Sequence, residues 1–214
     1  MTNIMADLMK LVEEKRVVPV VKLDRVEDAA PLAEALVKGG LPIAEVTFRT
    51  DAAEESIRIM AEKYPEMLVG AGTVTNVEQA EKAVAAGAKF IVTPGFSRDV
   101  TAYAVKNNIP IFPGICTPTE LMMAMEFGLT VVKFFPAEQY GGLKTINALA
   151  APFTKMKFMP TGGVGPKNLK EYLANPKIVA CGGSWMVKDA LVKEGKFDEI
   201  AQLCAEAVAL AQEV

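Results

Sequence analysis

Histidine is absent from the 214 residues of the chain, and cysteine is scarce. Histidine is the side chain that ordinarily titrates near neutral pH, so acid–base chemistry here would have to use carboxylates, lysine, tyrosine, cysteine or water. The three cysteines, Cys116, Cys181 and Cys204, are an odd number without close spacing, which indicates neither a disulfide framework nor a zinc site. Paired carboxylates are also missing from the predicted strand ends. We therefore expect no metal and no other cofactor.

An excess of positive charge and long apolar segments are missing as well. Lys and Arg total 23 against 26 Asp and Glu, a formal net charge of −3, which disfavours a nucleic acid or an anionic membrane as partner. No apolar run approaches the roughly 18 residues of a membrane-spanning helix. Residues 1–15 spread their charges along a helical pattern and lack the solid apolar core of a signal peptide. We expect a cytoplasmic globular protein in which any anion site is local.

Eight short apolar runs, several of them rich in β-branched residues, recur along the chain. Their starts are about 20 to 26 residues apart, and runs of this length bounded by Gly or Pro are typical of buried strands. The runs begin at Val17, Ile43, Leu68, Phe90, Ile111, Val131, Lys157 and Ile178.

Segments with helical spacing lie between the runs. Asn76 is placed as an N-cap, and Thr117 with Glu120 forms a capping box in a segment that ends at Gly128. Alternating strands and helices predict a parallel sheet, because parallel strands need a crossover connection. Eight such units favour a closed barrel over an open sheet, whose edge strands would be more polar. We predict an α/β protein with residues 1–214 as a single (β/α)8 TIM barrel domain that carries an N-terminal helix.

Polar residues and glycines gather where the runs end. In a barrel of this type the active site lies at the carboxyl ends of the strands. Residues two apart on a strand share a face, which places Glu45 with Arg49 and Lys133 with Phe135. The remaining candidates at the strand ends are Thr73, Pro94, Thr161, Gly162, Gly163 and Ser184.

Lys133 stands in the apolar stretch VVKFFPAE, residues 131–138, where an ammonium group is costly to desolvate. It could belong to an edge strand, pair with Glu45, or act as a nucleophile. Burial disfavours the charged amine, and a neutral amine can add to a ketone to form a Schiff base. Glu45 in turn could be a structural partner of Lys133 or Arg49, or the group that moves protons. Pairing and catalysis are compatible if Glu45 holds a proton during part of the cycle.

Two glycine-rich stretches, TGGVGP at 161–166 and GGSWMV at 182–187, follow the last two runs. Phosphate sites of (β/α)8 barrels form at these positions, because glycine lets backbone N–H groups approach an anion closely. Ser184 could add a hydroxyl donor and Arg49 a fixed positive charge. The alternative is that both stretches are only tight turns.

The motifs EVTFRT, GAGTV, TPG, PGICTPTE, VKFFPAE, PTGGV and GGSWM occur in this order. With these motifs the chain resembles the 2-keto-3-deoxy-6-phosphogluconate aldolases over nearly its whole length. These are class I pyruvate aldolases of the Entner–Doudoroff route, and they are often also active as 4-hydroxy-2-oxoglutarate aldolases. The resemblance implies a (β/α)8 barrel that assembles as a homotrimer and needs no metal.

The resemblance also implies a role for each residue that matches a motif. Lys133 would be the Schiff-base lysine and Glu45 the general acid–base. The residues around the pyruvyl part and the substrate chain would be Arg49, Thr73, Pro94, Phe135 and Thr161, and those near the phosphate Gly162, Gly163 and Ser184. Arg16 is a loose match to a basic residue often found before the first strand, and Cys116 stands where serine is common.

The reaction implied is cleavage of 2-keto-3-deoxy-6-phosphogluconate to pyruvate and glyceraldehyde 3-phosphate, and of 4-hydroxy-2-oxoglutarate to pyruvate and glyoxylate. One alternative on the same barrel is a phosphosugar isomerase or epimerase that uses Glu45 without covalent chemistry. Another is a phosphosugar-binding barrel without catalysis. The motifs leave open the preferred aldehyde and the stereochemistry at C4.

Overall fold

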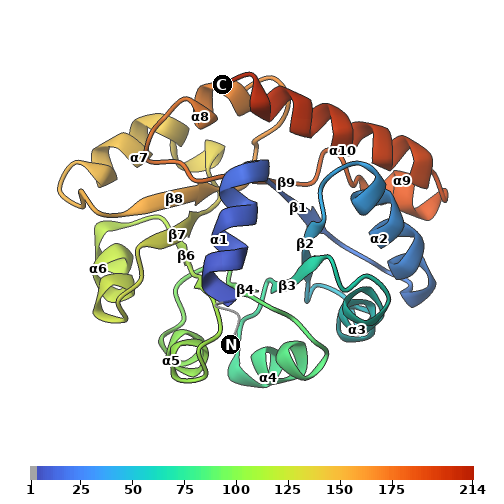
Figure 1. Cartoon of the computed structure of the whole chain (residues 1–214). Coiled ribbons are helices and arrows are strands. Elements are labelled where there is room, and N and C mark those ends of the chain that lie inside the picture. Colours follow the sequence, from blue (N-terminus) through green and yellow to red (C-terminus); the bar gives the residue numbers. More distant parts are fainter. Residues whose placement is uncertain (1–3) are drawn as a thin grey trace.

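A curled parallel sheet surrounded by helices makes up the computed structural model of the chain, which describes residues 4–214 (Figure 1). Residues 1–3 of the predicted domain lie outside the described residues. The strands are β1 (Val17–Val21), β2 (Ile43–Thr47), β3 (Leu68–Gly72), β4 (Ile91–Val92), β5 (Ile111–Phe112), β6 (Gly114–Ile115), β7 (Val131–Phe134), β8 (Lys157–Pro160) and β9 (Cys181–Gly183).

Helices separate most of the strands along the chain, and all of them except α1 form the outer layer in Figure 1. They are α1 (Ile4–Lys15), α2 (Ala29–Lys38), α3 (Ala53–Lys63), α4 (Val77–Ala85), α5 (Arg98–Lys106), α6 (Pro118–Glu126), α7 (Gly142–Ala150), α8 (Leu169–Leu173), α9 (Asp189–Lys193) and α10 (Phe197–Gln212), with 3-10 helices η1 (Val26–Asp28) and η2 (Glu138–Tyr140). Within residues 4–214, no helix combines the length and apolar character needed to cross a membrane.

The sheet consists of two parts in which every pair of neighbouring strands is parallel. Six strands follow the order β5-β4-β3-β2-β1-β9, and three follow the order β6-β7-β8. Two isolated bridges, Phe158 with Ile178 and Thr161 with Gly182, link the β8 side to the β9 side. The parallel arrangement expected from the strand–helix alternation is therefore confirmed.

The run that begins at Ile111 differs from its prediction, because it is divided at Pro113 into two short strands. β5 pairs with β4, whereas β6 pairs with β7 in the other part of the sheet. Proline has no N–H and cannot donate to a ladder. Its carbonyl still accepts a hydrogen bond from the backbone N–H of Lys133 at 2.9 Å, so the break lies directly beside a candidate site residue.

The helix N-caps predicted at Asn76 and Thr117 are confirmed by the hydrogen bonds of their side chains. The Asn76 side chain accepts a hydrogen bond from the backbone N–H of Gln79 at the start of α4. Thr117 and Glu120 form a reciprocal capping box at the start of α6, which satisfies N–H groups that the helix itself leaves free. Gly128 follows α6 with φ of +73°, a conformation in which glycine carries little steric penalty.

Alternation along the strands divides the apolar side chains into two layers. Outward-facing residues such as Ala44 and Val46 pack beneath the helices. Inward-facing residues fill the space that the sheet encloses: Val18, Ile43, Phe90, Val92, Phe112, Met159, Val179 and Ala180. Leu8 and Val12 of α1 join this inner cluster, and α1 lies across the centre of the ring in Figure 1. The N-terminal helix therefore caps the end of the interior at which the strands begin.

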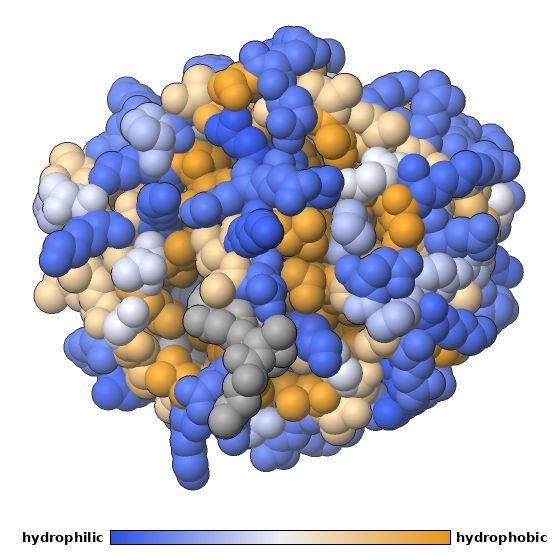
Figure 2. Space-filling model, in the orientation of Figure 1, coloured by the Kyte–Doolittle hydropathy of each residue, from blue (hydrophilic) through white to orange (hydrophobic). Residues whose placement is uncertain are grey.

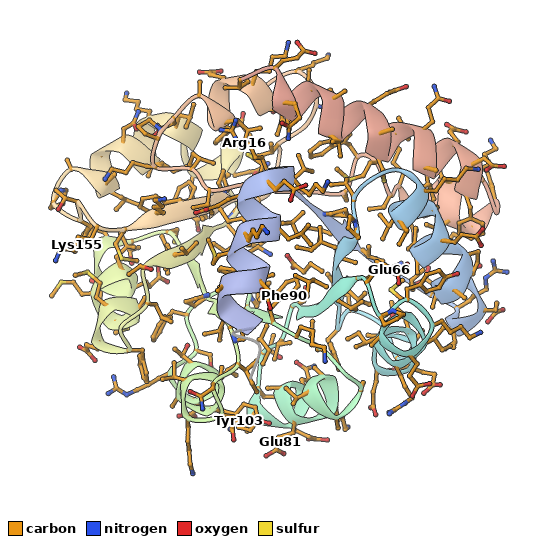
Figure 3. All side chains as sticks on the ribbon, viewed as in Figure 1. Arg16, Glu66, Glu81, Phe90, Tyr103 and Lys155 are labelled. Carbon is orange, nitrogen blue, oxygen red and sulfur yellow. The ribbon has the colours of Figure 1, made fainter. Side chains whose placement is uncertain are left out.

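The surface of the end covered by α1 is more hydrophilic than the inner cluster beneath it. Figure 2 shows hydrophilic residues along α1, with apolar residues on both sides of the helix. In Figure 3, Phe90 lies near the centre beside α1, whereas Glu81 and Tyr103 lie on the outer helices. The inner cluster is thus covered by an amphipathic helix, which buries its apolar face and exposes its charges.

Phe90 offers a test of this inner packing. Its side chain is 1% exposed, its ring centroid lies 6.2 Å from that of Phe112, and a Cβ added to Gly70 would lie 2.4 Å from its ring. Phe90→Ala is expected to lower the free energy of unfolding by about 3–5 kcal/mol, because the cavity cannot collapse between strands. Urea denaturation at fixed protein concentration measures the free energy of unfolding. Tyr140→Ala, at a residue 51% exposed, should change the free energy of unfolding by only about 0.5 kcal/mol. An equal loss of stability in the two variants would contradict the place of Phe90 in the inner cluster.

Candidate active site

A cavity of about 340 Å³ opens at the carboxyl ends of the strands. It brings together every site residue predicted from the sequence: Glu45, Arg49, Thr73, Pro94, Lys133, Phe135, Thr161, Gly162, Gly163 and Ser184. Val20, Val164 and Gly183 also line it; Val164 and Gly183 were predicted only as parts of the two glycine-rich stretches, and Val20 was not predicted. The two valines carry no polar signal, and only their place in the fold distinguishes them from other core valines.

A buried ion pair forms the floor of the cavity. Lys133 on β7 donates a hydrogen bond from Nζ to Oε1 of Glu45 on β2 at 3.1 Å, and the two side chains are 5% and 0% exposed. Glu45 lies two residues beyond Ile43 of the inner cluster, so alternation aims its side chain into the same interior. The pair therefore sits directly above the apolar filling, across the curled sheet. Of the interpretations left open for Lys133, an edge position is excluded, since β7 has a neighbour on each side.

Protein groups satisfy only part of the hydrogen-bonding capacity of the ion pair. Oε2 of Glu45 is buried without a hydrogen-bond partner among the described residues, and so is Oγ1 of Thr161 in the same cavity. The amine of Lys133 also lies 5.2 Å from the centre of the Phe135 ring, whose face attracts cations. A buried carboxylate needs all its lone pairs satisfied to be stable. The free oxygen therefore marks a place for a ligand or a water molecule.

The backbone beside Glu45 is shaped to fit its carboxylate. A Cβ at Gly72 would lie 2.2 Å from Oε1 of Glu45 and 2.4 Å from its Cγ, so only glycine leaves room there. The next residue, Thr73, has φ of +56°, which for a β-branched residue costs of order 1–3 kcal/mol. Strain of this kind at the wall of a cavity is typical of functional sites. Gly72 was predicted only as part of the GAGTV motif, without a role of its own.

Arg49 supplies an unpaired positive charge at the mouth of the cavity. Its Nε donates to Oγ1 of Thr47 at 3.1 Å, and Thr47 donates in turn to the carbonyl of Val21 at 2.8 Å. No carboxylate of the described residues lies within ion-pair distance of the guanidinium. Thr47 thus orients the side chain from Nε and leaves its terminal nitrogens for an anion, as guanidinium geometry favours.

The glycine turn after β8 presents free backbone donors. Gly162 and Gly163 have φ of +98° and +80°, in the left-handed region that favours glycine. The N–H groups of Gly163 and Val164 donate to no acceptor within the part of the chain that is described. Ser184, at the end of β9, is exposed beside them in the cavity wall. Successive free N–H groups in such a turn form a concavity that binds anions.

Two residues considered from the sequence lie outside the cavity wall. Arg16, labelled in Figure 3, lies at the amino end of β1, where its guanidinium donates to the carbonyls of Val214 at 3.0 Å and Leu173 at 2.5 Å. It ties chain segments together at the end opposite the cavity and does not line the cavity. Cys116 is half-buried after β6, and burial, followed by the nearby Glu120 carboxylate, raises the pKa of its thiol.

The cavity lies at the carboxyl ends of a parallel sheet and contains an amine–carboxylate pair and hydrogen-bond donors suited to an anion. These features are typical of α/β enzymes that act on small anionic substrates. Within residues 4–214, no group of three or more Cys, Asp or Glu side chains is arranged to hold a metal ion.

A family model for KDPG and KHG aldolase matches residues 8–203. The 2-dehydro-3-deoxy-phosphogluconate aldolase of Treponema pallidum is 50% identical over 199 residues, which cover 93% of this chain and 95% of the relative. The chain belongs to the KDPG and KHG aldolase family, so the resemblance inferred from the motifs is confirmed.

Two solved structures share both fold and sequence with the chain. A KDPG aldolase from Legionella pneumophila, with pyruvate captured at low pH as a covalent carbinolamine intermediate, superimposes with a TM-score of 0.90 at 38% identity, covering 93% of this chain and 97% of that one. The 2-keto-3-deoxy-6-phosphogluconate aldolase of Zymomonas mobilis with 3-phosphoglycerate gives a TM-score of 0.89 at 40% identity, with 96% and 97% covered.

Proposed function

We propose that the chain is a class I aldolase that cleaves 2-keto-3-deoxy-6-phosphogluconate to pyruvate and glyceraldehyde 3-phosphate, and 4-hydroxy-2-oxoglutarate to pyruvate and glyoxylate. The observation that carries the proposal is the buried contact between Lys133 and Glu45 on the cavity floor, with 3.1 Å between Nζ and Oε1. Family membership supports it, as does the covalent pyruvate adduct of the Legionella relative.

Lys133 starts the reaction as a nucleophile. Its ammonium form passes a proton to Glu45, and the neutral amine attacks the C2 ketone of the substrate. Glu45 returns this proton to the hydroxyl of the carbinolamine, which leaves as water, and an iminium ion remains with its positive nitrogen in place of the ketone oxygen; the Glu45 carboxylate is then free to act as a base. The iminium nitrogen is the electron sink for the next step.

Glu45 moves the protons of the cleavage step. Through a water molecule at its free Oε2, it removes the proton of the C4 hydroxyl. The C3–C4 bond breaks, its electron pair passes to the iminium as an enamine, and the aldehyde leaves. Glu45 then returns a proton to C3, and hydrolysis releases pyruvate and regenerates Lys133.

The remaining cavity residues hold the substrate at both ends. Arg49 and Thr73 bind near the pyruvyl part, where the guanidinium offers its free terminal nitrogens to the carboxylate. Pro94 and Phe135 line the path of the carbon chain, and the unpaired hydroxyl of Thr161 contacts the substrate. The phosphate lies at the glycine turn and the neighbouring serine: Gly162, Gly163 and Ser184.

The architecture that fits these features is a single closed (β/α)8 barrel domain in a cytoplasmic enzyme. The chain passes from β5 to β6 through one residue, and two bridges link the β8 and β9 sides. Both observations support closure of the two parts of the sheet into one barrel.

The Schiff base is tested directly by reduction. Incubation with pyruvate and borohydride is expected to add the reduced pyruvyl group permanently to Lys133, located by peptide mass spectrometry. Lys133→Arg keeps a cation beside Glu45 but cannot form the imine, so it should take up no label and release no pyruvate. Labelling elsewhere, or turnover by Lys133→Arg, would point instead to non-covalent chemistry.

Glu45→Gln tests the proton carrier. The amide keeps the shape of the side chain but cannot accept and return a proton, so pyruvate release should fall by about 10²–10⁴-fold. Stopped assays on 2-keto-4-hydroxy acids with and without phosphate measure the rates. Thr101→Ala, which removes another unpaired buried hydroxyl away from the cavity, is the control. Unchanged turnover in Glu45→Gln would remove its proposed role.

Assembly as a homotrimer is also proposed, with the apolar surface of α6 in the contact. Met122, Met123 and Met125 are 60%, 37% and 46% exposed there, and exposed apolar groups of this kind mark interfaces. Light scattering should give about three times the chain mass of 23.0 kDa. Met122→Lys with Met125→Lys should lower that mass, whereas Glu81→Lys on α4 should not. A wild-type mass of one chain would contradict the proposal.

A further inference from the structure

Behind the glycine turn, on the side away from the cavity, lies the short helix η2. Residues 135–137 connect it to β7, so the stretch VVKFFPAE carries both Lys133 of the cavity floor and Glu138. Glu138 does not line the active-site cavity. It lines a separate hollow together with Glu171 and Tyr172 of α8. The proposed mechanism gives this carboxylate no role, although it lies against the turn that the substrate phosphate would use.

Three consecutive carbonyls of the turn are bonded by groups outside it. The N–H of Ala137 donates to the carbonyl of Thr161 at 2.8 Å, and the N–H of Glu138 donates to that of Gly162 at 3.1 Å. Nδ2 of Asn168 donates to the carbonyl of Gly163 at 3.1 Å. In a trans peptide the N–H points opposite to the carbonyl. Holding the carbonyls of Gly162 and Gly163 therefore aims the free N–H groups of the following residues away from η2 and α8.

The side chain of Glu138 also packs against the turn. A Cβ at Gly163 would lie 2.4 Å from Cγ and 2.6 Å from Cβ of Glu138, so the methylene groups rest on the Cα of that glycine. Further along, the carboxylate accepts a hydrogen bond from the hydroxyl of Tyr172. Tyr172 is 2% exposed and belongs to the outer core, which makes it a fixed support.

The contact with Tyr172 also keeps the negative charge of Glu138 away from a bound anion, because the carboxylate is turned into the other hollow. Burial raises the pKa of Tyr172, and the carboxylate beside it raises it further. The hydroxyl therefore stays protonated, and remains a donor, across the neutral range.

We propose that Glu138, held by Tyr172, is a positioning residue that sets the backbone of residues 162–164 for the substrate phosphate. The inference rests on the proposed function for the identity of the substrate. It predicts that this support matters for phosphorylated substrates alone, since the contacts reach the turn and not the Lys133–Glu45 pair.

Steady-state kinetics of four variants test the proposal on 2-keto-3-deoxy-6-phosphogluconate and on 4-hydroxy-2-oxoglutarate. Glu138→Ala should raise KM for the phosphorylated substrate about tenfold, with kcat little changed and KM for the unphosphorylated one unaltered. Tyr172→Phe should act in the same direction by about threefold, and Glu138→Gln should stay near wild type because its amide oxygen accepts the same hydrogen bond. Glu171→Ala, which removes an exposed carboxylate from the same hollow, should have no effect.

A second measurement does not depend on aldolase activity. Titration of inorganic phosphate into the ¹⁵N-labelled protein should shift the amide signals of Gly163 and Val164, and Glu138→Ala should weaken this binding about tenfold. Equal KM changes for both substrates, or unaltered KM and phosphate affinity in Glu138→Ala, would overturn the proposal. If Glu138→Ala does not fold, Tyr172→Phe decides, and an unaltered KM there overturns it.

Trapping of pyruvate on Lys133 separates this inference from the proposed function. Wild type and Glu138→Ala should be labelled equally with pyruvate and borohydride, because pyruvate carries no phosphate. No label on the wild type would overturn the proposed aldolase activity, whereas the phosphate titration would still decide the role of Glu138.

Discussion

The burial of two opposite charges side by side, Lys133 and Glu45, is the constraint on which the site depends. An ammonium or a carboxylate alone would be costly at this depth, and each is tolerated because the other lies 3.1 Å away. In the proposed mechanism, the same arrangement lets a proton pass between them without crossing solvent. Among residues 4–214, one oxygen of the carboxylate has no hydrogen-bond partner, so a ligand or a water molecule in the cavity would complete the pair.

The residues below and beside this ion pair determine its position inside the sheet. Below it lies the inner apolar cluster, which Leu8 and Val12 of α1 join from the end at which the strands begin. Beside it, Gly72 leaves space for the carboxylate, and the carbonyl of Pro113 holds the backbone of Lys133. The break of the sheet at that proline therefore helps to hold the strand that carries the amine.

The side of the cavity formed by the glycine turn after β8 is built on a different principle. Its donors are backbone N–H groups in a left-handed turn, and their direction depends on what holds the carbonyls of the same peptides. Those partners come from η2 and α8, outside the cavity, with Glu138 and Tyr172 behind the turn. Because η2 follows β7 after residues 135–137, Lys133 and the groups that hold the glycine turn belong to one stretch of the chain.

Much of this could be predicted from the sequence, because local patterns determine it. Apolar runs predicted the parallel strands, and capping residues predicted that a helix begins at Thr117. The charged residues Lys133 and Glu45, each within an apolar run, were predicted to lie in one site. Other features depend on atoms distant in the chain. Nothing near Gly72 or Glu138 in sequence shows that one makes room for Glu45 and the other packs on Gly163, and Arg16 matched a pattern yet lies at the opposite end of the strands. The sequence alone determined the order of elements and the chemistry available; the tertiary structure decided distances and directions, because packing between segments far apart in the chain sets them.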